Sequence, residues 1–168
     1  MTGNMKTLTI LRHAKSSWSD SSLPDHDRPL NARGERDAPM MAGRLRLAGI
    51  RPSLILCSSA TRARATAKEI AKEISYPLEF LQRERALYHA SAKALLEILA
   101  EQDVGFNSIL IVGHNPGLTD LANFLVPDLT DNLPTCGFVS VEVDRDDWDF
   151  SNVEGVELAA YDYPKRSA

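Results

Sequence analysis

Three short runs of the chain are predominantly apolar, at residues 8–11, 54–57 and 109–112. Each run is rich in residues that favour strands, is bounded by polar residues, and is too short for a helix. Such runs are typical of parallel strands that are buried on both faces of a sheet. The pattern therefore predicts three buried parallel strands.

Between these runs, apolar positions repeat with the spacing of a helical face. Ser59 is placed to cap one such helix and Ser91 to cap another, and a third follows Pro116. The inward faces consist of Ala63, Ala67, Ile70 and Ile74 in the first helix, of Leu95, Ile98 and Leu99 in the second, and of Leu118, Leu121, Ala122 and Leu125 in the third.

Segment 31–47 is also helical in pattern, but Pro39 interrupts it. Proline lacks an N–H group and clashes with the preceding turn. It therefore either kinks this helix or stands in its first turn, with Asp37 as the cap. The pattern is compatible with both arrangements.

The C-terminal part alternates with a period of two. Valines at 139, 141 and 143 alternate with polar residues, and so do the apolar residues at 156, 158 and 160. This predicts a hairpin of half-exposed strands. Strands that alternate with helices, followed by a closing strand pair, predict an α/β sandwich around a mostly parallel sheet, with room for one antiparallel strand at an edge.

Length and charge narrow the class of protein. The chain of 168 residues suits a single domain, spanning 1–168. Its 19 basic and 23 acidic residues give a net charge of −4, whereas nucleic-acid-binding proteins usually have a basic excess. No apolar run approaches the roughly 20 residues that cross a bilayer, and the N-terminus lacks the apolar stretch of a secretory signal. We therefore expect a cytoplasmic protein that binds neither nucleic acid nor membranes.

Each predicted strand is followed by an unusual polar group. The first gives Arg12-His13-Ala14-Lys15, the second gives Ser58-Ser59-Ala60-Thr61-Arg62, and the third gives Gly113-His114-Asn115-Pro116-Gly117. The carboxyl ends of parallel strands lie at one edge of a sheet, so two arginines, two histidines and a helix N-terminus are expected to converge there. Arginine offers paired donors and keeps its proton, which suits a phosphoryl group. We expect a phosphate ester, or a phosphate or sulfate ion, to bind.

Histidine is the best candidate for the nucleophile. Cys57 and Cys136, the only two cysteines, lie in apolar stretches and are expected to be buried thiols without an activating base. Neutral imidazole exists at physiological pH and needs no base. Of the two histidines, His13 directly follows Arg12 and so suits attack beside a phosphate clamp, while His114 would donate a hydrogen bond to the phosphoryl oxygens.

Arg12-His13, the Ser58-to-Arg62 segment and Gly113-His114 together resemble the histidine phosphatase superfamily, which includes the cofactor-dependent phosphoglycerate mutases. Other features resemble its SixA-type phosphohistidine phosphatase branch. These are the short length, Asp27-Arg28-Pro29-Leu30 with Arg33-Gly34, the turn from His114 to Gly117, and Trp148 with Pro164. The resemblance runs from about Lys6 to Pro164.

The resemblance implies a three-layer αβα fold without a metal or other cofactor. It implies His13 as nucleophile, Arg12 and Arg62 as catalytic phosphate ligands, and His114 as the second histidine of the pocket. Ala14 departs from the glycine that is usual in the superfamily. The general acid stays open. Glu84 lies near the place of a glutamate in mutase-like relatives, and Asp27 is the second candidate.

Several residues keep alternative roles. Arg64 is an alternative to Arg62 as phosphate ligand. Lys15 either touches phosphate or a partner protein, or lies in a solvated loop. His26 and His89 have no partners at metal-ligand spacing, so they are expected at the surface.

These residues predict a phosphatase that forms a covalent phosphohistidine on His13. Only 51 residues separate Arg62 from His114, which leaves no room for an inserted domain that would enclose a small metabolite. An open site suits phosphohistidine on a partner protein, such as a phosphotransfer domain, although this assignment rests mainly on the resemblance. The alternatives are a phosphatase of broad specificity for small phosphate monoesters and, from another class, a phosphate-binding module without turnover.

Overall fold

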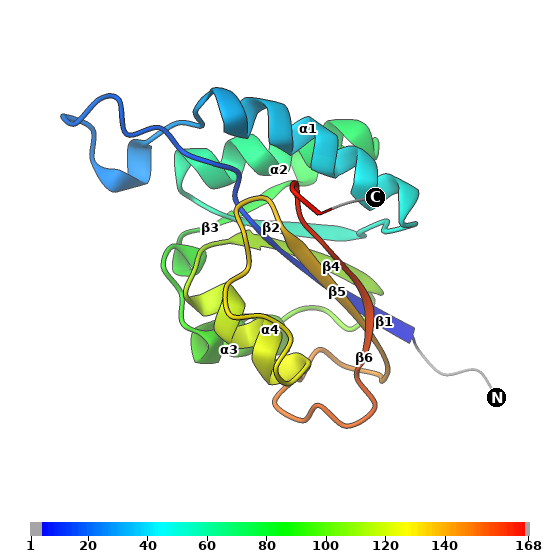
Figure 1. The fold of residues 1–168 in the computed structure, drawn as a ribbon. Helices are drawn as coiled ribbons and strands as arrows, with labels where there is room; N and C mark the ends of the chain where they lie inside the picture. The colour runs from blue at the N-terminus through cyan, green and yellow to red at the C-terminus, as the bar shows by residue number, and fades with distance from the viewer. Residues whose placement is uncertain (1–4, 167–168) are drawn as a thin grey trace.

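A six-stranded sheet with helices on both faces forms the protein in the computed structural model, which describes residues 5–166 (Figure 1). The strands are β1 (Met5–Arg12), β2 (Leu54–Ser58), β3 (Gln82–Glu84), β4 (Ser108–Gly113), β5 (Phe138–Asp144) and β6 (Glu157–Asp162). The α-helices are α1 (Ala32–Leu47), α2 (Thr61–Glu73), α3 (Ala92–Ala100) and α4 (Gly117–Leu125). Single 3-10 turns are η1 (Asp25–Asp27), η2 (Leu78–Phe80) and η3 (Arg85–Leu87).

The strands lie in the order β3-β2-β4-β1-β5-β6. The first four are parallel to one another, and β5 pairs antiparallel with both β1 and β6. The predicted α/β fold with a mostly parallel sheet is thus confirmed, as is the C-terminal hairpin. The antiparallel strand β5 stands one place in from the edge, and β6 beyond it again runs with the parallel strands. The three predicted strands, β2, β4 and β1, are neighbours near the centre.

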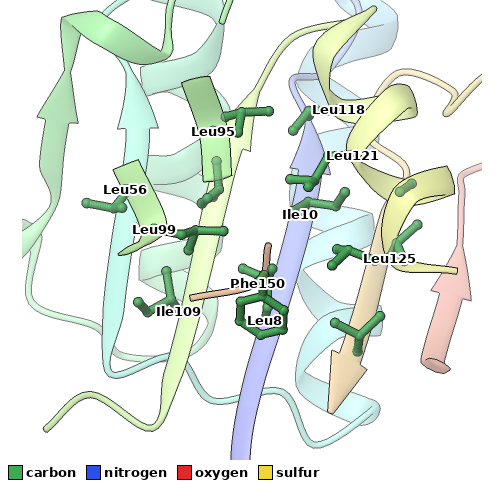
Figure 2. Close-up of a cluster of buried hydrophobic side chains, with 14 of the residues drawn as sticks. Leu8, Ile10, Leu56, Leu95, Leu99, Ile109, Leu118, Leu121, Leu125 and Phe150 are labelled. Carbon is green, nitrogen blue, oxygen red and sulfur yellow. The ribbon is translucent and has the colours of Figure 1, made fainter. Parts of the chain in front are cut away.

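Helices α1 and α2 cover one face of the sheet, and α3 and α4 cover the other (Figure 1). On the second face, Leu8 and Ile10 of β1 pack with leucines of α3 and α4, as Figure 2 shows. On the first face, Leu11 packs in a separate cluster rich in alanines of α1 and α2. Burial on both faces explains why these strands are apolar nearly throughout.

The helix starts follow the sequence with one exception. Asn31 caps α1 by accepting from the Gly34 N–H, and Pro39 lies inside a helix that continues past it, so Asp37 is not the cap. Ser91 caps α3 as predicted. The predicted Ser59 cap is wrong, because α2 begins after Ala60, with no side-chain cap. The Ser59 hydroxyl lies 2.8 Å from Nε2 of His26 instead.

The two cysteines are buried and unpaired in the described part of the chain. Burial raises the pKa of the Cys57 thiol to about 11, and burial with the nearby Asp37 raises that of Cys136 to about 12. Neither thiol is therefore activated as a nucleophile. Within residues 5–166, none of the helices has the length and apolar character needed to span a membrane.

Candidate active site

A cavity of about 210 Å³ opens where β1 and β4 end. Its lining includes all four principal residues expected from the sequence, Arg12, His13, Arg62 and His114, which we call the floor. Lys15 also lines the cavity. Four further residues from surrounding segments, which we call the rim, are Trp18, Asp25, Arg28 and His89. Ser16, Asn115 and Thr135 complete the lining.

His13 is held as a neutral imidazole. It is only 7% exposed, and its Nδ1 lies 2.8 Å from the Ala14 carbonyl oxygen. A carbonyl only accepts, so Nδ1 carries the proton and the lone pair of the ring is on Nε2. Burial lowers the pKa of His13 to about 3, helped by the charges of Arg62, Arg12 and Arg28 and opposed by the Ala14 contact.

Arg62 connects the floor residues to one another. It is buried in the first turn of α2, and its Nε donates to Nε2 of His13 at 3.3 Å. Its Nη2 lies 3.5 Å from Nδ1 of His114. Arg64, the alternative ligand, lines a different cavity with Lys68 and Arg83. The geometry therefore favours Arg62 as the arginine that contacts a phosphoryl group.

His114 faces His13 across the floor, with ring centroids 5.0 Å apart. Its Nε2 lies 2.7 Å from the hydroxyl of Ser58, the last residue of β2. Burial lowers the pKa of His114 to about 2, with further contributions from His13, Arg62 and His89. Both floor histidines are thus uncharged in the empty site.

Arg12 supplies a donor that the protein does not satisfy. Its Nη1 donates to the Leu133 carbonyl at 3.1 Å, whereas its buried Nε has no hydrogen-bond partner among residues 5–166. Burial and the nearby Arg62 charge lower the pKa of Arg12. Buried donors without partners are costly, so Arg12 is held at the cavity with hydrogen-bonding capacity that the fold leaves unused.

Two contacts fix the loop that follows β1. The Thr66 hydroxyl accepts from the Ala14 N–H at 3.0 Å and donates to the Arg62 carbonyl at 2.8 Å, which ties the loop to α2. On the other side, a Cβ on Gly34 would lie 2.1 Å from the Lys15 carbonyl oxygen. Only glycine fits there, which explains the Arg33-Gly34 pair at the start of α1.

The rim centres on Asp25, which the sequence analysis did not single out. Its Oδ1 accepts from Nε and Nη2 of Arg28 at 3.1 and 2.9 Å. Its Oδ2 accepts from Nη2 of Arg62 at 3.0 Å and from the Tyr88 hydroxyl at 2.5 Å. Burial alone would raise the pKa of Asp25, but the hydrogen bonds from Tyr88, Arg62 and Arg28 outweigh it and lower the pKa. Asp25 is therefore an ionised carboxylate.

Both proposed acids lie outside the cavity lining. Glu84 is the last residue of the edge strand β3, paired in register with Ser58, and Oδ1 of Asp27 lies 3.4 Å from Nδ1 of His26. A signal for Asp25 was present, since it stands two residues before Asp27 and three before Arg28 in a segment already noted for its resemblance.

The two remaining histidines differ in placement. His26 contacts Ser59 and packs edge-on against Tyr88, outside the cavity lining. His89 lines the cavity, and its Nε2 lies 3.2 Å from Oδ2 of Asp25. Its expected surface role is therefore only half right, because the side chain is 53% exposed yet belongs to the rim.

Comparisons of sequence find both a family and relatives. The model of the histidine phosphatase superfamily (branch 1) matches residues 8–86. An uncharacterized chloroplastic protein of Arabidopsis thaliana is 34% identical over 152 residues, which are 86% of this chain and 69% of the relative. An uncharacterized protein of Mycobacterium leprae is 30% identical over 167 residues, which are 92% of this chain and 100% of the relative.

Comparisons of structure agree with this family. A candidate phosphohistidine phosphatase SixA of Agrobacterium tumefaciens superposes with a TM-score of 0.81 at 25% identity, covering 95% of this chain and 98% of that one. The protein histidine phosphatase SixA in complex with tungstate gives a TM-score of 0.71 at 22% identity, covering 92% and 95%. With the floor geometry and the sequence matches, these findings show that the chain belongs to the histidine phosphatase superfamily, in its SixA-type branch.

Proposed function

We propose that this protein is a metal-independent phosphatase that forms a covalent phosphohistidine on His13 and removes the phosphoryl group from histidine on a partner protein. One observation carries the proposal. A neutral His13 has its Nε2 lone pair directed at the Arg62 guanidinium, in a cavity that Arg12 also lines.

In the first step, Nε2 of His13 attacks phosphorus as the P–N bond to the substrate histidine breaks, while Arg12 and Arg62 hold the equatorial oxygens. His114 joins them once its Nδ1, which accepts from Arg62 in the empty site, carries a proton. The guanidinium donors are fixed before the reaction, so they stabilise the developing charge without reorganising. As the N–P bond forms, the His13 ring becomes cationic. Its Nδ1–H keeps donating to the Ala14 carbonyl at 2.8 Å, a contact that strengthens as the ring gains charge.

In the second step, water attacks the phosphohistidine and His13 leaves as neutral imidazole. The environment that lowers the pKa of His13 to about 3 favours this uncharged leaving form. The same environment thus prepares the nucleophile and assists its release.

The rim supports a protein as the substrate. Between Arg62 and His114 the chain forms the rest of α2, two 3-10 turns, the short strand β3, helix α3 and strand β4, with no domain inserted over the cavity. Trp18 stacks on Arg28 at 3.5 Å and is 72% exposed. Arg28 itself is buried, but an exposed tryptophan is typical of protein contact surfaces. The structures that resemble this chain include a candidate phosphohistidine phosphatase SixA and a protein histidine phosphatase SixA.

The deciding assay compares a phosphohistidine-bearing protein with an aryl phosphate, both in excess EDTA. The wild type is expected to dephosphorylate the protein efficiently and the aryl ester poorly, and His13→Ala is expected to act on neither. His26→Ala, a histidine outside the cavity lining, serves as the matched control.

Other outcomes change the proposal in defined ways. Faster turnover of the aryl ester would favour the broad-specificity alternative while leaving the His13 chemistry in place. Loss of activity in EDTA, or activity retained by His13→Ala, would overturn the mechanism. Phosphate binding without turnover of either substrate would favour the binding module.

A further inference from the structure

An ionised carboxylate at the rim of a phosphate site requires an explanation. Asp25 is held by donors from four residues, Arg28, Arg62, Tyr88 and His89, so its place is fixed. A carboxylate repels a phosphoryl dianion, and this repulsion disfavours phosphate binding nearby. Because Asp25 is held here despite this repulsion, its carboxylate suits a second binding group, one that carries hydrogen-bond donors.

Arg62 sets where this carboxylate lies relative to the chemistry. The guanidinium contacts His13 through Nε at 3.3 Å and Asp25 through Nη2 at 3.0 Å. Nucleophile and carboxylate therefore flank the same phosphate-binding group. A phosphoryl group held by Arg62 and attacked in line by His13 has its leaving group directed away from His13, toward the rim.

The imidazole of His89 already contacts the Asp25 carboxylate. Nε2 of His89 lies 3.2 Å from Oδ2 of Asp25, and its side chain is 53% exposed. The His89 backbone has a φ of 56°, in the left-handed region that non-glycine residues seldom adopt. The chain thus places an exposed imidazole of its own where a substrate imidazole would arrive.

We propose that Asp25 binds the ring N–H of the leaving imidazole, and that the phosphohistidine ring of the substrate displaces His89 from Asp25. This inference rests on the proposed function and deepens it, because it assigns the preference for phosphohistidine to one residue of the rim.

The substrate ring carries the phosphoryl group on one nitrogen and a proton on the other, and that N–H donates to Asp25. The His13 Nε2 lone pair forms the new N–P bond, and the electron pair of the breaking P–N bond returns to the substrate ring. The ring leaves as neutral imidazole with the proton it brought, and Asp25 stays ionised throughout.

An alkyl phosphate gains nothing from this arrangement. Its leaving oxygen needs a proton as the bond breaks, and a carboxylate that donors from Arg28, Arg62 and Tyr88 hold in the ionised form has none to give. The same residue thus favours phosphoramidates and disfavours esters.

The test compares Asp25→Asn with the wild type on a phosphohistidine peptide and on nitrophenyl phosphate, whose leaving group needs no proton. Asp27→Asn, in the same 3-10 turn, is the matched control. On the peptide, Asp25→Asn is expected to lose about tenfold or more in kcat/KM relative to its loss on the aryl ester, as for a charged hydrogen bond removed. Equal losses on both substrates would overturn the inference, because Asp25 would then only position Arg62.

His89→Ala provides an independent measurement. Removal of the competing imidazole is expected to lower KM for the phosphohistidine peptide about threefold, the effect of one exposed hydrogen bond, and to leave KM for the aryl ester unchanged. An unchanged or higher KM for the peptide would contradict the displacement. A wild type that hydrolyses nitrophenyl phosphate but not the peptide would overturn the proposed substrate class, and this inference with it.

Discussion

The floor and the rim of the cavity are held in place in different ways. The floor residues extend from elements of the central sheet, His13 from β1, His114 from β4 and Arg62 from the first turn of α2. The sheet ladder fixes their backbones, and burial fixes their protonation states. Rim residues such as Asp25 and His89 lie in loops and 3-10 turns and are held mainly by one another.

This difference separates two tasks. A group that stabilises the transferring phosphoryl must be rigid whatever the substrate is, and the sheet provides that rigidity. A group that contacts the leaving group must suit one substrate class, and loops can change without disturbing the sheet. Substitutions in the floor should therefore affect all substrates alike, whereas substitutions in the rim should depend on the substrate.

The strongest challenge to this division is Arg62→Lys. Lysine keeps the charge but loses the forked donors to His13 and Asp25, so kcat/KM should fall about 100-fold on the phosphoprotein and the aryl ester alike. Steady-state kinetics on both substrates give the answer, with Arg64→Lys, two residues along α2, as the near-neutral control. A loss confined to one substrate would place Arg62 with the rim.

A second prediction concerns the protonation of the floor. The folded-state pKa of His13 is about 3, below its unfolded value. The unfolded chain therefore binds more protons as pH falls through about 6.5. The contribution of His13 to the free energy of unfolding is therefore complete above about pH 6.5, and it decreases as the pH falls toward the folded-state pKa. Between pH 7 and about 5, His13 alone should contribute a loss of about 2 kcal/mol.

Urea unfolding of the wild type and His13→Gln at both pH values measures this contribution. The variant lacks the titrating ring, so its loss of stability should be smaller by that amount. Equal pH dependence in the two proteins would show that the floor does not hold His13 neutral.

The loop that follows β1 depends on Thr66, and Thr66→Val tests that dependence. The change leaves the buried Ala14 N–H without its acceptor, which should reduce the free energy of unfolding by about 1–3 kcal/mol. Denaturant titration measures it, with Thr61→Val in the same helix as the comparison. An unchanged midpoint would mean that the loop finds another acceptor.

The smallest expected effect concerns Trp18, a residue of the rim. Trp18→Ala removes the exposed ring that stacks on Arg28, and KM for a phosphohistidine-bearing protein should rise about threefold to tenfold. Hydrolysis of the aryl phosphate is the internal control and should change little. An equal rise in KM for both would indicate that Trp18 supports the cavity rather than a partner.

The same division explains what could be predicted from the sequence. Arg12 ends β1, His13 and His114 directly follow β1 and β4, and Arg62 lies four residues beyond β2. Local pattern and the rule for parallel strand ends therefore suffice to place them. Asp25 reaches Arg62 across 37 positions and Tyr88 across 63. Nothing periodic in its loop indicates those contacts, because they form only when β1, α2 and η3 are assembled.

Glu84 illustrates the remaining limit. It became a candidate acid only from its place after the second motif, as in mutase-like relatives, and the structure sets it at the carboxyl edge of the sheet, paired with Ser58. Sequence spacing does not say whether a side chain at that edge belongs to the cavity, and the lining includes Asp25 rather than Glu84. The Ser59 cap failed for a similar reason, since α2 begins after Ala60.

The short connection between Arg62 and His114 has a practical consequence for protein engineering. Strand β3 has three residues and pairs only with β2, and it leads through η3 to the rim histidine at position 89. Additional chain grafted into this connection would reach the mouth of the cavity while leaving β1, β4 and their ladder intact. If the proposed function holds, a roof added there would exclude protein substrates and admit only small phosphorylated molecules.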